Sequence, residues 1–333
     1  MSLRLTKFQR QLCNVLQEGL PVCWRPFAEI AKVINSDETQ VLQKIGQLKD
    51  RGIVRRICAL TNYRALGMTS TLVAAHVPAE SLQEVVEAIN SLENVSHNYR
   101  RNHYYNLWFT LQAETPAQIE VTLTNLSGRF DIDFHSLPAK RVFKLDVRFD
   151  AVDGRSQKSE VRGQKNLSLR EDLSSVFCLL SSVQKLILSK LQDDLELVEE
   201  PFAFLCGEGL AKQDVLRIIK ELIDKGVIRR IAAVVDHRKL GFVVNVLFAG
   251  EVPQDRIVQA GQRLARFGMV SHCYERETCE NWPYNLFAMM HGRSMGQIQH
   301  VINRFVKAEK IDSFQLLPTA AELKKQPVRH KFY

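Results

Sequence analysis

The hexapeptide Gly52-Ile-Val-Arg-Arg-Ile57 appears a second time, slightly altered, as Gly226-Val-Ile-Arg-Arg-Ile231. Other short matches flank both copies in the same order. They are Pro26-Phe27 with Pro201-Phe202, Leu66-Gly67 with Leu240-Gly241, Val95-Ser-His-Asn-Tyr-Arg-Arg101 with Val270-Ser-His-Cys-Tyr-Glu-Arg276, Tyr105-Asn-Leu107 with Tyr284-Asn-Leu286, and Leu137-Pro138 with Leu317-Pro318. Matches that keep one order indicate an internal duplication. The 333 residues therefore hold two copies of one unit.

Each copy begins with apolar residues at helical spacing. In the first copy three such stripes start at Phe8, Phe27 and Val41. The third stripe follows Ser36, an expected N-cap, and stops at Gly52, an expected helix-ending glycine. An extended segment over residues 53–60 comes next. Three short helices and a strand predict a winged helix-turn-helix.

The apolar period changes from helical to alternating after Leu66-Gly67. We expect strands at 69–77, 95–103, 105–113 and 132–144, and helices at 82–89 and 116–126. This βαββαβ order predicts a ferredoxin-like sandwich, and the second copy repeats it over about 243–317. Both helices of such a sandwich cover one sheet face, so the other face is left to meet a partner sheet or a ligand.

The predicted fold class is α+β, a tandem duplication of a winged helix-turn-helix followed by a ferredoxin-like βαββαβ domain. The polar run Gly154–Asn166 marks the linker. The expected domains are winged helices at 1–62 and 176–237, ferredoxin-like domains at 63–150 and 238–333, the last with a C-terminal tail, and a linker at 151–175.

Composition excludes several classes of protein. The 45 Lys+Arg against 37 Asp+Glu give +8, spread evenly over both copies, which is a weak bias toward anionic partners. No apolar run approaches the roughly 18 residues of a membrane span, and the first residues do not resemble a signal peptide. We expect a cytoplasmic protein without membrane partners. The seven cysteines contain no C-x-x-C pair, so we expect reduced thiols.

Polar side chains line one predicted strand in each copy. His97, Tyr99, Arg101 and His103 share one face by strand alternation, while Asn98, Arg100 and Asn102 share the other. The second copy repeats the first three as His272, Tyr274 and Arg276. Such a row is costly unless it is hydrogen-bonded or meets an anionic ligand. Sheet-to-sheet hydrogen bonds would explain a single copy, but the repetition favours a flat, anionic ligand.

Other features have simpler interpretations. We expect His76, His135, His237 and His300 to lack functional companions, and the basic tail Lys324–Lys331 to be solvated. The sequence leaves open whether His291 and Arg293 line a pocket or have a structural role.

At these motifs the sequence resembles a known family. The domain order resembles the Lrp/AsnC regulators, and the string HNYRRNHYYNLWFTL, residues 97–111, more narrowly resembles sirohaem decarboxylases. Trp282-Pro-Tyr-Asn285 and Met290-His-Gly-Arg293 resemble the companion subunit type of that family. A fused pair is similar to the NirDL type of haem d1 biosynthesis.

The resemblance implies loss of carbon dioxide from two acetate groups of sirohaem, giving 12,18-didecarboxysirohaem without an added cofactor. It makes His97 and His103 the candidates for proton donor or ligand to the substrate iron, and Arg100 and Arg101 the candidates for gripping carboxylates. No metal of the protein's own is implied. The implied substrate-binding residues are Tyr99, Asn102, Tyr105, Asn106, Trp108, His272, Tyr274 and Arg276.

The second copy departs from the motif. Glu275 and Glu277 stand where the first copy has Arg100 and Asn102, and a short insertion displaces the match to His103. Because a glutamate repels a polyanion, we expect the second copy to be a supporting half and each chain to hold one site.

Two other classes stay open from the sequence. A DNA-binding regulator would need basic recognition helices, but 37–50 and 210–225 mix both charges. The arginines that could touch phosphates, which we interpret as a solvated wing, are Arg51, Arg55, Arg56, Arg229 and Arg230. A haem-responsive regulator or carrier would use the same histidines without chemistry. We do not expect DNA binding. The resemblance implies a homo-oligomer or a complex with NirG-like and NirH-like subunits.

Overall fold

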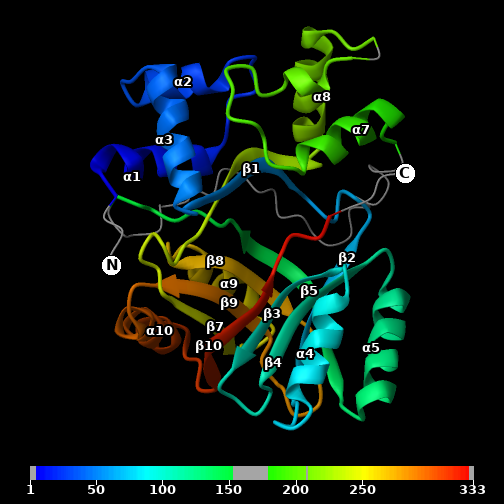
Figure 1. Cartoon of the computed structure of the whole chain (residues 1–333). Coiled ribbons are helices and arrows are strands. Elements are labelled where there is room, and N and C mark those ends of the chain that lie inside the picture. The colour runs from blue at the N-terminus through cyan, green and yellow to red at the C-terminus, as the bar shows by residue number, and fades with distance from the viewer. Residues whose placement is uncertain (1–4, 153–178, 208, 330–333) are drawn as a thin grey trace.

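The computed structural model describes residues 5–152, 179–207 and 209–329. A helical layer lies on one side of the molecule and a strand-rich barrel on the other (Figure 1). The predicted linker at 151–175 falls outside the described residues, apart from its first two. The domain boundaries expected from the sequence remain a proposal.

The first helical unit comprises α1 (Lys7–Glu18), α2 (Pro26–Val33), α3 (Glu38–Asp50) and strand β1 (Val54–Thr61). A capping box between Thr6 and Gln9 starts α1. The cap of α3 is Asp37 rather than Ser36, because the Asp37 carboxylate accepts the Gln40 amide at 2.7 Å. Gly52 follows α3 with φ of 62°, which confirms the expected glycine stop.

The second helical unit comprises α7 (Ser182–Leu191), the 3-10 turn η1 (Ala203–Leu205), α8 (Lys212–Asp224) and β6 (Ile228–Val235). It lacks a full counterpart of α2 among the described residues. Gly207 and Gly209 have φ of 136° and 89°, values that left-handed or extended glycine adopts and a helix does not. The chain is therefore no longer helical soon after η1 ends.

The two helical units form one layer. Strand β1 pairs antiparallel with β6, with Cys58 opposite Ala232, in a two-stranded sheet. One apolar core joins both units, including Phe27 and Ile45 from the first and Phe202 and Ile219 from the second. In Figure 1 β1 lies between the helices and the barrel.

Eight strands close into one barrel in the order β10-β3-β4-β2-β5-β8-β9-β7. The βαββαβ order of each copy is as expected, but the two sheets join edge to edge instead of stacking face to face. The strands are β2 (Thr69–Ala75), β3 (Val95–Arg101), β4 (Leu107–Ala113), β5 (Phe134–Leu145), β7 (Val244–Gly250), β8 (Val270–Arg276), β9 (Leu286–Gly292) and β10 (Phe314–Lys325).

The long strands β5 and β10 link the two copies. The first part of β5 pairs with β2 of its own copy, and the part from Ala139 to Leu145 pairs with β8 of the other copy. Likewise β10 pairs first with β7 and then with β3. Each 12-residue strand thus extends past its own sheet and covers an edge that would otherwise stay unpaired.

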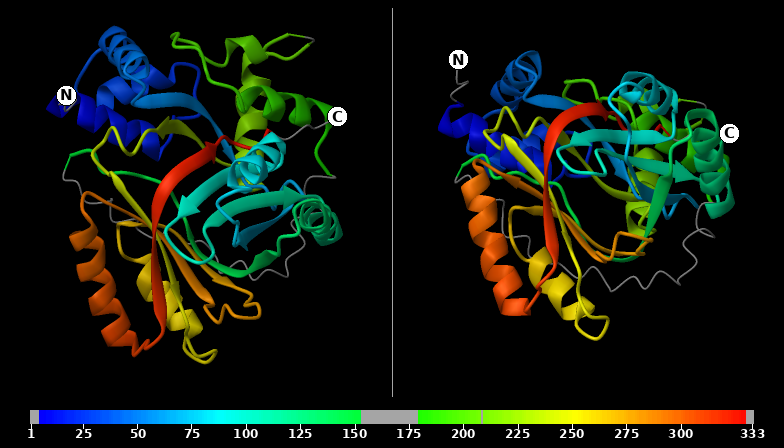
Figure 2. Two further views of the ribbon diagram at one scale, coloured as in Figure 1. Left: turned by 60° about the horizontal axis from the view of Figure 1, so that its bottom comes forward. Right: turned by 90° about the horizontal axis from the view of Figure 1, so that it is seen from below.

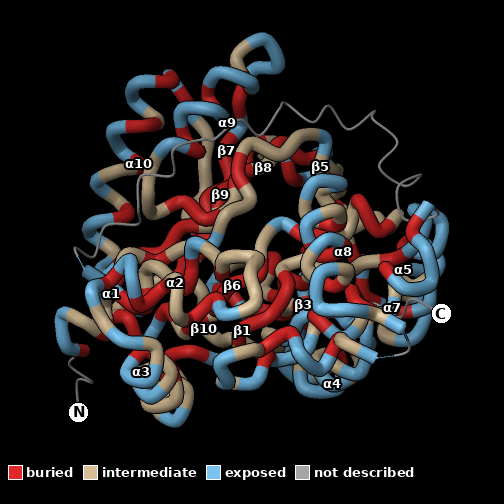
Figure 3. The backbone as a smooth tube through the Cα atoms, turned by 90° about the horizontal axis from the view of Figure 1, so that it is seen from above, coloured by how far each residue is buried: buried red, intermediate tan, exposed pale blue. Residues whose placement is uncertain are grey.

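Four helices cover the outside of the barrel. They are α4 (Leu82–Ser91) and α5 (Pro116–Phe130) on the first copy, and α9 (Ile257–Ala265) and α10 (Met295–Glu309) on the second (Figure 2). A separate apolar core lies under each pair. Figure 3 shows buried backbone concentrated in the strands, with exposed turns on the helices. The interior face holds its own cluster, which includes Trp108, Leu137, Phe287 and Leu317.

Candidate active site

Strands β3 and β8 carry the repeated His-x-Tyr-x-Arg motif on their interior face. Asn98, on the opposite face of β3, donates to Asn90 of α4, and Arg100 on that same face is exposed. The register of β3 with β4 shifts after Val95, and the register of β8 with β9 shifts after Val270. Such a bulge brings two consecutive side chains to one side. The predicted alternation is correct from His97 to Arg101, whereas Asn102 and His103 lie past the end of β3.

Four histidines gather at the barrel end that faces the helical layer, and we call them the histidine cluster: His97, His237, His272 and His291. Ser96 Oγ lies 2.8 Å from His97 Nδ1, and Ser271 Oγ lies 2.9 Å from His272 Nδ1. The rings of His237 and His291 are 4.9 Å apart between centroids. The expectation that His237 lacks companions was wrong, and His291, which the sequence left open, belongs to this cluster.

The imidazoles of the cluster are neutral near pH 7. Burial lowers the pKa of His97 to about 4 and that of His272 to about 3, the latter also through the positive groups around it. Burial and the nearby Lys325 lower the pKa of His237 to about 3, and burial holds the pKa of His291 well below its usual range. Since a protonated imidazole cannot bind iron, this state suits a metal ligand.

Basic side chains surround the histidine cluster, and we call them the basic rim: Arg55, Arg64, Arg229, Arg238 and Lys325. Each shifts the pKa of at least one interior tyrosine or histidine. Asp236 pairs with Arg55 at 2.8 Å, and Glu322 lies 3.6 Å from Lys325 and 3.9 Å from Arg238. The rim therefore keeps a surplus of positive charge.

Arg229 belongs to the basic rim. It is exposed, and burial of part of its surroundings together with the neighbouring Arg230 lowers its pKa. Arg229 also donates weakly to the Leu145 carbonyl at 3.4 Å. Arg229 and Arg230, which contacts Asp146 at 3.1 Å, thus reach the end of β5, while Arg55 and Arg229 are exposed, as a solvated wing would be.

Arg101 and Arg276, the two arginines of the barrel interior, each donate a hydrogen bond to the other copy. Arg101 Nη1 donates to the Leu317 carbonyl at 2.6 Å, and Arg276 Nη1 donates to the Leu137 carbonyl at 2.7 Å. Each guanidinium also lies over the tyrosine two residues before it, at 5.4 Å for Tyr99 and 4.7 Å for Tyr274. The Nε atoms of both arginines are buried without a partner.

His103 lies apart from His97. Strand β3 ends at Arg101, and His103 follows in the loop to β4, where its Nδ1 accepts the Tyr105 amide at 3.1 Å. Arg101 is four residues further along the strand than His97, a span of about 13 Å. The His103 ring contacts Trp282 at 5.6 Å. The two histidines expected to act together therefore lie toward opposite ends of the barrel.

Several other candidates from the first copy lie at this opposite end. Trp108 Nε1 donates to the Tyr105 carbonyl at 2.7 Å, and the Trp108 ring meets Trp282 at 5.3 Å. The Asn106 amide exchanges two hydrogen bonds with the Val77 backbone, as Asn285 does with Val252. Asn102 is exposed. These contacts close the loops at this end of the barrel.

Glu275 does not face the barrel interior. It is buried on the other side of β8, where Gln254 donates to it at 3.1 Å and Arg141 lies 3.5 Å away. Glu277 is exposed after the strand. The argument that Glu275 would repel a polyanionic ligand, and so reduce the second copy to a support, therefore has no structural basis.

Sequence reasoning missed His237 and Lys325 for different reasons. His237 replaces Tyr63 of the first copy, so a comparison of the repeats could have singled it out. Lys325 was assigned to a solvated tail, but β10 continues to Lys325, whose Nζ lies 3.3 Å from His237 Nδ1. Of the other three histidines without expected companions, two have ring contacts, since His76 stacks on Tyr104 and His135 contacts Tyr105, and His300 is exposed on α10.

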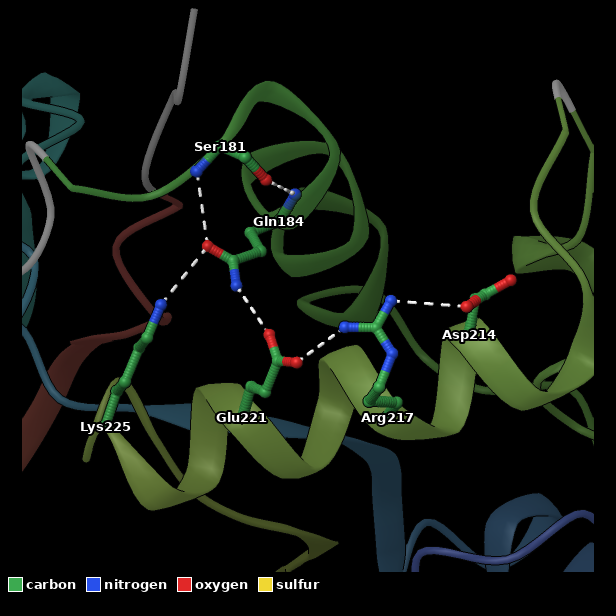
Figure 4. Close-up of polar contacts among 6 residues, drawn as sticks. All are labelled: Ser181, Gln184, Asp214, Arg217, Glu221 and Lys225. Atoms are coloured by element: carbon green, nitrogen blue, oxygen red, sulfur yellow. Dashed lines mark hydrogen bonds and ion pairs between the residues drawn. The ribbon is translucent and has the colours of Figure 1, made fainter.

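Basic side chains of the second helical unit pair within that unit. Arg217 contacts Asp214 at 3.2 Å and Glu221 at 2.6 Å, and Gln184 bridges Glu221 and Lys225 (Figure 4). The arginine of α8 is therefore engaged by two carboxylates. Among the described residues no helix is long and apolar enough to cross a membrane, and no group of three or more His, Cys, Asp or Glu could hold a metal.

Comparison with known proteins agrees with this architecture. The family model described as AsnC-like ligand binding domain matches residues 65–144 and again 239–324, and the model described as Siroheme decarboxylase NirDL-like HTH domain matches 9–55. The fold and the two matches define a tandem protein of the Lrp/AsnC class, with two ligand-binding domains in one chain.

Relatives that align over most of the chain identify one family within this class. A "Siroheme decarboxylase" from Hydrogenobacter thermophilus is 33% identical over 326 residues, which cover 97% of this chain and 94% of that protein. The "Siroheme decarboxylase NirDL subunit" of Paracoccus denitrificans is 29% identical over 92% of this chain and 91% of its own length. The crystal structure of the siroheme decarboxylase NirDL aligns with a TM-score of 0.70 at 30% identity, covering 97% of this chain and 94% of that one. The chain belongs to the sirohaem decarboxylase family.

Proposed function

We propose that this chain removes carbon dioxide from two acetate side chains of sirohaem and yields 12,18-didecarboxysirohaem, with the substrate bound at the histidine cluster. One observation carries the proposal: four imidazoles that are buried or half-buried, and whose pKa values are lowered, lie beside a positively charged rim at one end of the barrel. An iron tetrapyrrole with many carboxylates needs both features. A related NirDL structure was solved in complex with an iron-uroporphyrin III analogue, at a TM-score of 0.69 and 29% identity.

His97 and His272 are the candidate ligands to the substrate iron. Ser96 and Ser271 engage the Nδ1 atoms, and no hydrogen bond to either Nε2 is found among the described residues. A hydrogen bond at one ring nitrogen fixes the tautomer and directs the other nitrogen toward a metal. Tyr99 and Tyr274, one step further along each strand, can flank the macrocycle.

The basic rim holds the carboxylates that stay on the substrate. Arg229 and Arg64 have no carboxylate partner among the described residues, so they are free to form bidentate pairs with substrate carboxylates. Arg101 is engaged with Leu317, and Arg100 lies on the outer face, so neither fits the gripping role that the resemblance implied.

The reaction needs a proton and a dry site. Protonation of the ring carbon next to the one that bears the acetate turns the ring into an electron sink, so the carboxylate leaves as carbon dioxide. The methylene then takes up a proton and the ring carbon gives its proton back. For each carboxyl group one C–C bond breaks, one C–H bond forms and one proton is consumed. The protein positions the acetate and excludes water, which favours loss of the charged carboxylate.

The test is anaerobic incubation of the purified chain with sirohaem, followed by product mass. Loss of two carbon dioxide units supports the proposal. Sirohaem left unchanged, together with tight, salt-sensitive binding to one DNA duplex, would favour the regulator instead. An inactive chain is retested with NirG-like and NirH-like subunits, because relatives include separate alpha, beta and NirD subunits. We place the reaction in the cytoplasm, in agreement with the free thiols of the described cysteines.

A further inference from the structure

Glu322 is an acidic residue of β10 that lies among the cations of the basic rim. It pairs in register with Tyr99, two residues along β3 from His97, and directly paired residues of neighbouring strands share a face. The Glu322 side chain is 17% exposed, and its Oε2 is buried without a hydrogen-bond partner. Lys325 and Arg238 lie 3.6 Å and 3.9 Å from that oxygen, beyond hydrogen-bond length. A carboxylate oxygen left in this state is costly unless a bound molecule makes use of it.

The matching position of the other repeat is apolar. Strands β5 and β10 align without a gap, which places Val142 at the position of Glu322. Val142 pairs with Tyr274 in the same way that Glu322 pairs with Tyr99. The same fold thus closes the barrel with a valine at this register. The carboxylate of Glu322 is therefore not a requirement of the fold.

The basic rim consists of two unequal halves. The half next to His97 contains two carboxylates among its cations, and its members are Arg55, Asp236, Arg238, Glu322 and Lys325. The half next to His272 contains Arg64 and Arg229, and there Asn62 and Val142 stand at the positions of Asp236 and Glu322. Asp236 is engaged by Arg55 at 2.8 Å, so Glu322 is the carboxylate of the rim with a free oxygen among the described residues.

We propose that Glu322 faces the acetate that loses carbon dioxide and raises the free energy of the bound substrate by charge repulsion. The inference rests on the proposed function, and it assigns the carboxylates that stay on the substrate to Arg64 and Arg229. Two carboxylates in a partly buried site repel each other strongly, because little water screens them. When the C–C bond breaks, its electron pair passes into the protonated ring and carbon dioxide leaves without charge. The repulsion by Glu322 therefore falls as the reaction proceeds.

Repulsion in the bound substrate has a distinct kinetic signature. Removal of the Glu322 charge should tighten substrate binding and slow bond cleavage by a similar factor, while kcat/KM stays nearly constant. A glutamate that only neutralises Lys325 and Arg238 would behave differently. Its removal would tighten binding of every polycarboxylate and leave the rate of bond cleavage unchanged.

Two variants remove the charge. Glu322→Gln keeps the shape of the side chain, and Glu322→Val installs the residue that the other repeat carries at this register. Asp236→Asn is the control, because it makes the same charge change at a carboxylate of the same half that Arg55 already engages. The single-turnover rate of carbon dioxide release is measured against sirohaem concentration. Absorbance titrations compare iron-uroporphyrin III with iron-coproporphyrin III, which has methyl groups in place of the acetates.

We expect both Glu322 variants to bind sirohaem roughly 5- to 50-fold more tightly and to release carbon dioxide more slowly by a similar factor. Affinity should rise for iron-uroporphyrin III and stay within about two-fold for iron-coproporphyrin III, which has no acetate to repel. The rate of Asp236→Asn should stay within about three-fold of that of the unaltered chain.

Two results overturn the role of Glu322: an unchanged rate of bond cleavage in both variants, or equal gains in affinity for the two porphyrins. If the unaltered chain leaves sirohaem intact, the proposed function itself fails. The porphyrin titrations do not depend on turnover, so they still show whether an acetate lies against Glu322.

Discussion

Arg101 of the first copy donates to the Leu317 carbonyl of the second at 2.6 Å, and Arg276 repeats the contact with Leu137 at 2.7 Å. The two matched motifs of the duplication, His-x-Tyr-x-Arg and Leu-Pro, thus meet across the copies. Each arginine is buried and binds where a long strand passes from one sheet to the other. The arginine of the motif serves the closure of the barrel.

Arg101→Met should destabilise the fold without a specific effect on substrate. The change keeps an apolar stem and leaves the Leu317 carbonyl without its donor, at a cost of about 1.5–3 kcal/mol for a hydrogen bond to a charged group. Urea unfolding measures this loss of folding free energy. Arg100→Met, on the exposed face of the same strand, should stay within about 0.5 kcal/mol. If Arg101→Met keeps its stability but binds sirohaem poorly, Arg101 grips the substrate after all.

Stability should rise with pH between about 5 and 6.5. The four histidines of the cluster have pKa values below that of an unfolded histidine, about 6.5. The unfolded chain therefore binds more protons in this window, and acidification favours unfolding. Urea midpoints at several pH values give the slope. His291→Gln should reduce it, and an identical slope in that variant would refute a buried neutral His291.

Arg229→Gln should weaken sirohaem binding roughly 5- to 50-fold at low salt, since a charge-assisted contact to a carboxylate is lost. The effect should shrink in 1 M salt, where screening shortens the reach of charges to about 3 Å. Arg217→Gln is the control, because Arg217 pairs with Asp214 and Glu221 in the helical layer. Equal affinities of both variants would place the carboxylates elsewhere.

Trp282→Ala should cost about 3–5 kcal/mol of folding free energy, the usual range for removing a buried tryptophan. Trp282 is 2% exposed and packs against Trp108 and Tyr284 at the barrel end away from the histidine cluster. Tyr104→Ala, at the same end but 64% exposed, should cost far less. Chemical denaturation compares them, and similar losses would show that Trp282 does not hold this end together.

The sequence predicted the elements of the fold better than their assembly. Alternation and helical spacing located each strand of the βαββαβ units, and Gly52 marked the end of α3. The closure of the barrel could not be predicted, because it depends on β5 and β10 pairing with strands far away in the chain. Local patterns carry no information on such partners.

For the candidate site, the sequence predicted only part of the set of residues that the structure brings together. His97 and His272 came from alternation, which is local. His237 and Lys325 reach the same place from a loop after β6 and from the end of β10, through contacts that span much of the chain. His103 was placed with His97 because β3 was expected to continue to residue 103, whereas it ends at Arg101.

A single-turnover assay of His97→Ala beside His103→Ala tests the location of the site most directly. Both variants receive sirohaem anaerobically, and product mass is followed over time. We predict that His97→Ala loses at least about 100-fold in rate, within the range of general acid–base and positioning effects, and has an altered iron spectrum. His103→Ala should stay within about three-fold, because its ring lies at the other end of the barrel. Full activity in His97→Ala with none in His103→Ala would contradict a site at the histidine cluster.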